Sequence, residues 1–354
     1  MSSNGSALQT KPRVVVTSCR GDAPSFREIH DAMERAGIGH ECRSGDAIFL
    51  KPNLTYPSPR PGVTTRTDFI EAVATYFLER GCRLTVGEGP GGYNGFSMRA
   101  AFETHGLTRI ARRLGVDLVE LSEWEPEQVP VQLKRGREVR VPVPKRLLDD
   151  FHGLISLPVP KVHCITGVSL GLKNLWGCIA DTFRIRFHPF FDEILTKLAT
   201  VLPLRGTVLD GVYGLDENGP MLDGVPKRLN WIAASRDTGA HDVVLTKLLG
   251  FDPLRISHLR HGIRAGTVPR AEDVQVEAAG IRPERFALRP NIWNRLAKLT
   301  WAHRALTWLV YLSPIAGPIH GLMYRVRARP ADLSVRTLRG WTETEKSGFP
   351  PVGR

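Results

Sequence analysis

Short apolar runs alternate with amphipathic stretches along the first two thirds of the chain. Runs rich in Val, Ile and Leu are typical of buried strands, and apolar residues at helical spacing are typical of helices that cover a sheet. The alternation predicts a doubly wound α/β fold, with a largely parallel sheet and helices on both faces. The predicted strands are Arg13–Thr17, Ala47–Leu50, Arg83–Val86, Asp117–Leu121, Gly153–Pro158, Gly206–Asp210 and Asn230–Ser235, and the predicted helices are Ser25–Ala36, Arg66–Arg80, Ser97–Leu114, Phe190–Leu202 and His241–Leu249. Residues Pro130–Pro144 predict a hairpin around Gly136 at a sheet edge.

The C-terminal third has a different pattern. Residues Asn291–Arg327 hold three of the seven tryptophans, and Ala305–Tyr324 contains no Asp, Glu, Lys or Arg over about the length of a membrane span. Because Pro314 and Pro318 interrupt this stretch, one straight spanning helix fits it poorly. Two apolar helices packed on the domain or on a second subunit, an interfacial helix or lid flanked by basic residues, and a true span are the three alternatives.

The length and the apolar content allow one large folded unit. With 354 residues and 42% hydrophobic residues the chain can bury a sizeable core. We expect a flexible tail over 1–11, an α/β domain over 12–285, an apolar and basic helical segment over 286–330 and a C-terminal tail over 331–354. The first twenty residues lack the apolar core of a secretory signal, so a cytoplasmic location, with membrane association as an option, is expected.

Cysteine spacing and charge limit the possible functions. The five cysteines are scattered singly and form no CxxC pair, so we predict no zinc site and no iron–sulfur cluster. The formal net charge is +12, and residues 251–354 carry 17 Lys and Arg against 8 Asp and Glu. Since no zinc finger, RNA-recognition signature or basic stripe interleaved with aromatics occurs, nucleic acid is not the predicted partner. An anionic substrate or membrane surface fits the charge better.

The first candidate motif is AIFLKPNLTYPSPRPGVTTRTDF, in which an apolar strand leads to Lys51 and Asn53. Open α/β sheets bind ligands at the carboxyl ends of their strands. A lysine there can bind an anion or, if desolvated, act as a base or a Schiff-base nucleophile. Thr64 and Thr65 precede the next helix, whose free N–H groups could hold a carboxylate or phosphate. A plain strand end and helix cap is the alternative.

The second motif, LTVGEGPGGYNGFSMRAAF, places Glu88 in a glycine-rich turn between a strand and a helix. Glycines let a ligand approach the backbone, and a carboxylate at a strand end can abstract a proton. The motif lacks the GK[ST] of a Walker loop and does not match a dinucleotide-binding GxGxxG. It therefore indicates a general base or a tight turn without a ligand.

The third motif, ISLPVPKVHCITGVSLGLKNLWGCIADTFRIRFHP, concentrates basic side chains after one apolar strand, with Asp181 as its only acid. Cations at this density are unfavourable unless they face water or a charged ligand. The segment therefore predicts a polar pocket that includes Lys161, His163, Lys173, Asn174, Arg184 and His188.

Two acids follow later strands. Asp210 ends one predicted strand and Asp237 follows another, so both could reach the rim of the same pocket, and Asp242 opens the next predicted helix. They could orient a catalytic lysine or bind a divalent cation, and Asp237 could instead be only a helix N-cap. Because no His-x-x-x-His or EF-hand spacing accompanies them, we predict no dedicated metal site.

The order of these motifs resembles a known family. The succession IFLKPN, TTR, VGEG, LPVPKVH, GxSLGLKNLWG, RxxFHP, LDG, GP and ASxDxxAxD is similar to that of the domain-of-unknown-function 362 family, over about Val14 to Asp252. The resemblance implies an α/β fold. Many members resemble iron–sulfur proteins because they carry an appended ferredoxin domain with CxxCxxC spacing, which this sequence lacks. We therefore predict no cofactor. A looser likeness to the N-terminal domain of nickel-pincer lactate racemases, at the strand-end KPN, suggests proton or hydride chemistry on a hydroxy or keto acid.

These features predict an enzyme, of specialised metabolism, that isomerises, eliminates from or cyclises an anionic small molecule by proton transfer. An oxidoreductase or electron-transfer partner, and a module that docks on a membrane or dimerises through residues 291–327, are the alternatives. The predicted catalytic residues are Lys173, His163, His188 and Glu88, and the predicted substrate-binding residues are Lys51, Asn53, Thr64, Thr65, Lys161, Asn174, Arg184, Asp210 and Asp237.

Overall fold

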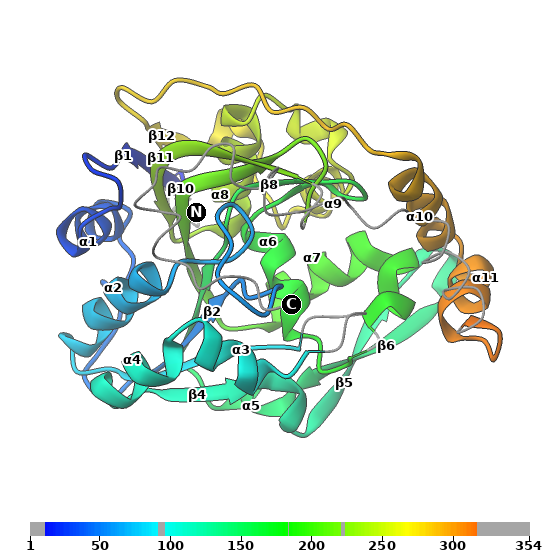
Figure 1. The fold of residues 1–354 in the computed structure, drawn as a ribbon, viewed down its shortest axis with the longest axis horizontal. Helices are drawn as coiled ribbons and strands as arrows, with labels where there is room; N and C mark the ends of the chain where they lie inside the picture. Colours follow the sequence, from blue (N-terminus) through cyan, green and yellow to red (C-terminus); the bar gives the residue numbers. More distant parts are fainter. Residues whose placement is uncertain (1–10, 91–95, 183, 221–223, 317–354) are drawn as a thin grey trace, which may run out of the picture.

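A ten-stranded sheet forms the centre of the molecule in the computed structural model, which describes residues 11–90, 96–182, 184–220 and 224–316 (Figure 1). Eight strands follow the order β12-β1-β11-β10-β7-β2-β3-β4, and β8 and β9 extend from β10. Their bounds are β1 Arg13–Ser18, β2 Ala47–Pro52, β3 Arg83–Glu88, β4 Asp117–Glu120, β7 Gly153–Leu157, β8 Lys161–His163, β9 Gly167–Ser169, β10 Leu204–Asp216, β11 Val225–Ser235 and β12 Gln275–Glu277.

The prediction of a largely parallel sheet is confirmed. Strands β10, β7, β2, β3 and β4 run parallel to their neighbours, and β1 runs parallel to β12. Two antiparallel pairings interrupt this pattern. Strand β11 pairs antiparallel with both β1 and β10, and β8 pairs antiparallel with β9. Strands β10 and β11 are much longer than the strands that we predicted from their apolar runs. The end of β10 and the start of β11 form a hairpin that continues beyond the parallel sheet.

Helices cover both faces of the sheet, as the prediction of a doubly wound fold requires. Alternate residues of one strand enter opposite cores: Val14 and Val16 pack on one face, and Val15 packs on the other. One face is covered by α1 Phe26–Arg35, α2 Thr67–Leu78, α3 Met98–Thr104 and α4 Leu107–Leu114. The other is covered by α6 Gly171–Asn174, α7 Phe191–Val201, α8 Thr238–Leu248 and α9 Ser257–Ala265. These opposed side chains bury the sheet from both sides, as expected for α/β proteins.

One predicted helix is divided in the structure, and the predicted hairpin lies in a different sheet from the one expected. The helix expected over Ser97–Leu114 is divided into α3 and α4, because Gly106 adopts a left-handed conformation with φ of 75°. The predicted hairpin exists as β5 Pro126–Gln132 and β6 Glu138–Pro144, but it forms a separate two-stranded sheet rather than an edge of the main one. Its apolar face packs into the core beside the short helix α5 Lys145–Asp149.

The C-terminal segment forms short helices at the end of the molecule opposite α1 (Figure 1). These are α10 Ile292–Ala302, α11 Arg304–Thr307 and a π-helical turn over Trp308–Leu312. Within the described part of the chain, no helix has both the length and the apolar character that a membrane crossing requires. The remainder of the predicted 291–327 segment, from residue 317 on, lies outside the described residues.

Candidate functional site

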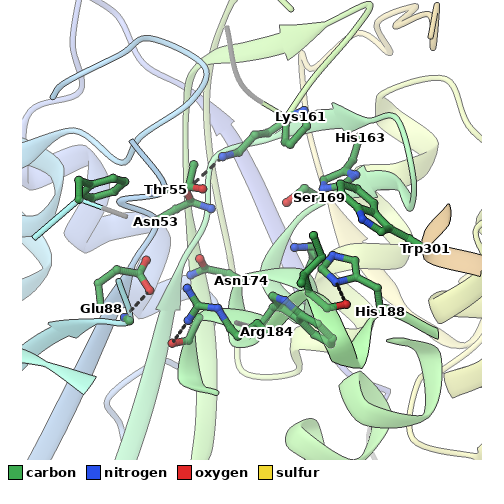
Figure 2. Close-up of a pocket in the computed structure, with 17 residues that line it drawn as sticks. Asn53, Thr55, Glu88, Lys161, His163, Ser169, Asn174, Arg184, His188 and Trp301 are labelled. Atoms are coloured by element: carbon green, nitrogen blue, oxygen red, sulfur yellow. Dashed lines mark hydrogen bonds between the residues drawn. The ribbon is translucent and has the colours of Figure 1, made fainter. Parts of the chain in front are cut away.

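A cavity of about 220 Å³ lies at the carboxyl end of β2 and β3, between the loops that follow them and the segment from β8 to α7 (Figure 2). This is the sheet edge at which α/β folds bind ligands. Three of the four predicted motifs meet there. Eight predicted residues line the cavity, namely Asn53, Glu88, Lys161, His163, Lys173, Asn174, Arg184 and His188, together with Trp176, Trp301 and seven others.

Lys51 and Glu88 form a buried ion pair behind the cavity wall. The two residues end the neighbouring parallel strands β2 and β3, and Lys51 Nζ lies 2.6 Å from Glu88 Oε1. Glu88 also accepts hydrogen bonds from the backbone N–H groups of Leu54 and Gly89, and Lys51 donates to the carbonyl of Pro52. Both groups are therefore saturated with partners, so the predicted role of Glu88 as a free base is not favoured by its surroundings.

Gly177 makes this buried pair possible. A methyl group in place of its hydrogen would lie 2.3 Å from Glu88 Oε1 and 2.7 Å from Lys51 Nζ. From the sequence, we predicted no role for the glycines of the GLKNLWG segment. The structure shows that one of them admits two charged side chains against the backbone.

Lys161 holds the loop after β2 in place. Its Nζ donates to Asn53 Oδ1 at 3.1 Å and to the carbonyl of Val63 at 2.6 Å. Burial, followed by the charge of Lys173, lowers the pKa of Lys161 to about 7. This amine therefore changes its charge near neutral pH, and a bound anion would favour its protonated form.

Lys173 differs from the other two lysines because its amine has no polar partner. Among the described residues it makes no hydrogen bond or ion pair, and its Nζ lies 5.9 Å from the ring centre of Trp176 and 5.4 Å from that of Phe191. Burial, followed by the charge of Arg184, lowers the pKa of Lys173 to about 7. A large share of this side chain is therefore a neutral amine at physiological pH.

A buried carboxylate fixes the short helix that carries Lys173. Asp242 accepts hydrogen bonds from the N–H groups of Gly171 and Leu172, each at 2.8 Å, and is also bonded to His241 Nδ1. These two N–H groups begin helix α6 and would otherwise lack partners. Sequence reasoning noted Asp242 only as the start of a helix, since nothing in the sequence signals that α8 packs against α6.

The two cavity histidines carry their hydrogens on opposite nitrogens. His163 Nδ1 accepts from the backbone N–H groups of Ile165 and Thr166, so its hydrogen resides on Nε2. His188 Nδ1 contacts the carbonyl of Ile185 at 3.1 Å and must donate to it, which leaves a lone pair on Nε2. Burial lowers the pKa of His163 far below its usual range and that of His188 to about 3, so both are neutral. One is a hydrogen-bond donor and the other an acceptor.

Arg184 and Asn174 bind the backbone of the site. Arg184 donates to the carbonyls of Gly177, Ile179 and Pro90, and Asn174 donates to the carbonyl of Lys51 and to Ser156 Oγ. Asn174 therefore ties the LKN segment to the KPN segment, and Arg184 ties the glycine-rich turn after β3 to the backbone that follows α6. Arg184 also adds a buried positive charge beside the cavity, where burial lowers its pKa.

The other four predicted residues lie elsewhere. Thr64, Thr65 and Asp210 line a second cavity of about 460 Å³ between the loop before α2 and β10. Thr65 Oγ1 bridges the N–H of Asn53 and the carbonyl of Leu157, and Asp210 accepts from the N–H of Arg66, so these side chains satisfy backbone groups. Asp237 is the N-cap of α8. The structure does not bring this group to the rim of the lysine cavity.

Trp301 closes the cavity from the C-terminal segment and was not anticipated as a site residue. Its ring centre lies 4.9 Å from that of His188, and its indole N–H is buried without a hydrogen-bond partner among the described residues. Trp176 packs against His188 at 5.2 Å. The apolar residues of α10 predict that this helix is partly buried, but they do not indicate which part of the protein it packs against.

The cysteines do not fit an iron–sulfur cluster. None of the five cysteines forms a disulfide, and within the residues that the structure describes no three His, Cys, Asp or Glu side chains lie close enough to share a metal ion. The donor set that a cluster requires is therefore not assembled in this part of the chain.

Comparison with known proteins identifies the family. The chain is 29% identical over 247 residues to a thylakoid-associated protein of Synechocystis sp., a match that covers 67% of this chain and 74% of the relative. A crystal structure of a protein from Thermotoga maritima superposes with a TM-score of 0.39 at 17% identity and covers 58% of this chain but only 54% of that one. That similarity is too low to carry an argument. The model of the family described as Domain of unknown function (DUF362) matches residues 48–247, more than half of the chain, and the protein therefore belongs to this family.

Proposed function

We propose that the protein is an enzyme that binds a small anionic organic substrate in the lysine cavity and moves a proton on it. The observation that carries the proposal is the charge of the site. Lys51, Lys161, Lys173 and Arg184 are opposed by the single carboxylate of Glu88 among the cavity residues and their direct partners. An anion that entered the cavity would balance this excess and would be held strongly, because the surroundings are of low polarity.

The histidines supply complementary proton chemistry. The lone pair of His188 Nε2 can accept a proton from the substrate, and the Nε2–H of His163 can donate a hydrogen bond to the oxygen on which negative charge develops. A carbanion or enolate formed in this way would be stabilised by the ammonium groups. Isomerisation, elimination and cyclisation all begin with such a step.

Metabolite binding tests the proposal. Wild type is compared with Lys173→Ala and with the control Lys145→Ala, in which the replaced lysine is exposed. Both variants remove one lysine, so a loss of metabolite binding in Lys173→Ala alone is specific to the cavity. After incubation with a cell extract and gel filtration, mass spectrometry should find an anionic metabolite on wild type and on Lys145→Ala but not on Lys173→Ala. Circular dichroism checks that each variant is folded. Equal binding by all three proteins would contradict the proposal.

Hydrogen exchange then tests the chemistry. In deuterated water the wild-type protein should incorporate deuterium into the bound metabolite. His188→Phe retains the aromatic packing with Trp176 and Trp301 but removes the acceptor, so it should bind the metabolite and exchange at least about tenfold more slowly. Unchanged exchange would assign the base to another group.

A second candidate function is docking on a membrane surface, for which the C-terminal helices give specific support. Ile292, Leu296 and Leu299 lie on one face of α10 and are 62%, 45% and 53% exposed, and Trp308 is 53% exposed. Residues 285–331 contain no Asp or Glu, while the exposed side chains include Arg295, Lys298 and Arg304. Apolar side chains flanked by cations are typical of helices that lie in an anionic lipid interface. The relative from Synechocystis is named as thylakoid-associated.

Flotation with liposomes tests this docking. Wild type should float with vesicles that contain phosphatidylglycerol, should float poorly with pure phosphatidylcholine, and should be released by salt. Leu296→Glu with Leu299→Glu should abolish flotation, whereas Leu254→Glu, an exposed leucine far along the chain, should not. If no vesicle binds and sedimentation shows a dimer that the double variant dissociates, the apolar face is a subunit interface instead.

A further inference from the structure

We propose that Lys173 is a nucleophile that forms a covalent imine with the carbonyl group of an aldehyde or keto acid. The inference rests on the proposed function for its anionic substrate and names the substrate class more closely. It follows from a comparison of the three lysines at this site, of which Lys161 and Lys173 line the cavity and Lys51 does not.

The amines of the other two lysines are engaged. Lys51 Nζ is held by Glu88 Oε1 at 2.6 Å and by the carbonyl of Pro52 at 2.8 Å. Lys161 Nζ is held by Asn53 and by the carbonyl of Val63. An amine that donates to such partners must break these bonds before its lone pair can attack a carbonyl carbon. Both amines are therefore held by polar partners and are not available to attack a carbonyl carbon.

The amine of Lys173 is free of these restraints. No acidic or carbonyl oxygen among the described residues accepts its hydrogens, and its Nζ lies over the rings of Trp176 and Phe191. A carboxylate beside this amine would keep it protonated and unreactive, whereas burial and neighbouring cations favour the neutral form that is nucleophilic. The electrostatic neighbours are Arg184 and Lys51, with Glu88 and Cys164 as weaker opposing influences.

The nucleophile is also positioned rigidly. The backbone of α6 is anchored at its first turn by Asp242, and Asn174, the next residue after Lys173, is bonded to β2 and β7 through Lys51 and Ser156. A fixed backbone on both sides holds the base of this side chain beside the cavity that it lines. Such positioning by a second set of residues is a common requirement for covalent catalysis.

The steps of imine formation balance with the groups present. The Lys173 lone pair bonds to the carbonyl carbon, and the π electrons move to the oxygen, to which His163 Nε2–H can donate a hydrogen bond. His188 Nε2 takes one proton from the nitrogen and delivers it to the oxygen, which gives a carbinolamine. The nitrogen lone pair then expels hydroxide, which takes a proton from solvent and leaves as water. The product is a protonated imine that can withdraw electrons from a neighbouring C–H bond.

The cavity restricts the size and charge of the substrate. A cavity of about 220 Å³ suits a small molecule rather than a large one. A small keto acid or aldehyde acid meets this limit. Its carboxylate would be balanced by Lys161 and Arg184, and its carbonyl would face Lys173.

Reductive trapping tests the proposal on the full-length protein. Glyoxylate at neutral pH forms an imine with a reactive lysine, and sodium cyanoborohydride reduces this imine to a stable carboxymethyl-lysine. Peptide mass spectrometry then locates the modified residue. An ordinary lysine amine, with a pKa of about 10.4, is almost wholly protonated at pH 7, so Lys173 should be modified about a hundredfold faster than exposed lysines. The exposed Lys145 and Lys247 of the same molecules are internal controls.

Variants separate the possible outcomes. Lys173→Arg keeps the positive charge but cannot form an imine, so it should retain the anionic metabolite and lose the rapid modification; Lys145→Arg should keep both. Should Lys173 of the wild type react no faster than Lys145 across the pH range, or should Lys161 be the modified residue, the proposal is overturned. If metabolite binding persists in that case, the proposed function stands without the imine. The wild-type comparison does not depend on the folding of any variant.

Discussion

Removal of the carboxylate of Glu88 should reveal how much the buried charge pair contributes to stability. Lys51 is fully buried, and its Nζ would keep only the carbonyl of Pro52 as an acceptor after Glu88→Gln. A glutamine has one carbonyl oxygen, so it cannot serve Lys51, Leu54 and Gly89 together. Breaking a buried pair by removing one partner typically destabilises a protein by about 3–5 kcal/mol.

Urea unfolding followed by circular dichroism measures this effect. With a slope of about 2–3 kcal/mol per molar urea, the midpoint of Glu88→Gln should fall by about 1–2 M. The double variant Lys51→Met with Glu88→Gln removes the stranded ammonium, so it should recover at least half of the lost free energy. A loss of less than about 1 kcal/mol in the single variant would refute the reasoning, because it would show that water or a rearrangement solvates Lys51.

Three further predictions concern the residues that support the site. Asp242→Asn removes one of the two charged acceptors at the start of α6, so trapping of Lys173 by glyoxylate should slow by about tenfold while circular dichroism is unchanged. Gly177→Ala places a methyl group against Glu88, and urea unfolding should show a loss of about 1–3 kcal/mol. Burial raises the pKa of Asp210 to about 6, so the folded state binds this proton more tightly than the unfolded chain, and wild-type stability relative to Asp210→Asn should fall by about 2 kcal/mol as pH rises from about 4 to about 6. A constant difference between these two proteins, measured by urea unfolding at each pH, would contradict that assignment.

The lysine cavity was largely foreseeable because its residues follow strand ends. Lys51 and Glu88 end β2 and β3, and the carboxyl ends of neighbouring parallel strands meet at one edge whatever the loops do. Lys161 and Lys173 follow the next apolar strand, β7, which pairs with β2. The motifs meet because β7, β2 and β3 are direct neighbours in the sheet.

Residues that act through long-range contacts were not foreseeable in the same way. Thr65 and Asp210 are of residue types that often bind ligands, but here they form hydrogen bonds with backbone groups of other segments. Only the fold specifies those partners. Asp242 and Trp301 lie far along the chain from Lys173 and His188. A single sequence carries no record of which helix packs on which loop.

The position of β1 has a consequence for biosynthesis. This strand is synthesised first, yet it pairs only with late segments: Val16 with Ala233 of β11, and Arg13 with Gln275 of β12. While the ribosome is still producing the middle of the chain, β2, β3 and β7 can already pair with one another, but the strands that pair with β1 do not yet exist. The backbone N–H and C=O groups of β1 therefore remain unpaired until β11 and β12 have been synthesised. A nascent chain stalled before β11 should therefore be cleaved by protease near its N-terminus and should be a target for chaperones, whereas the completed chain should resist cleavage at β1.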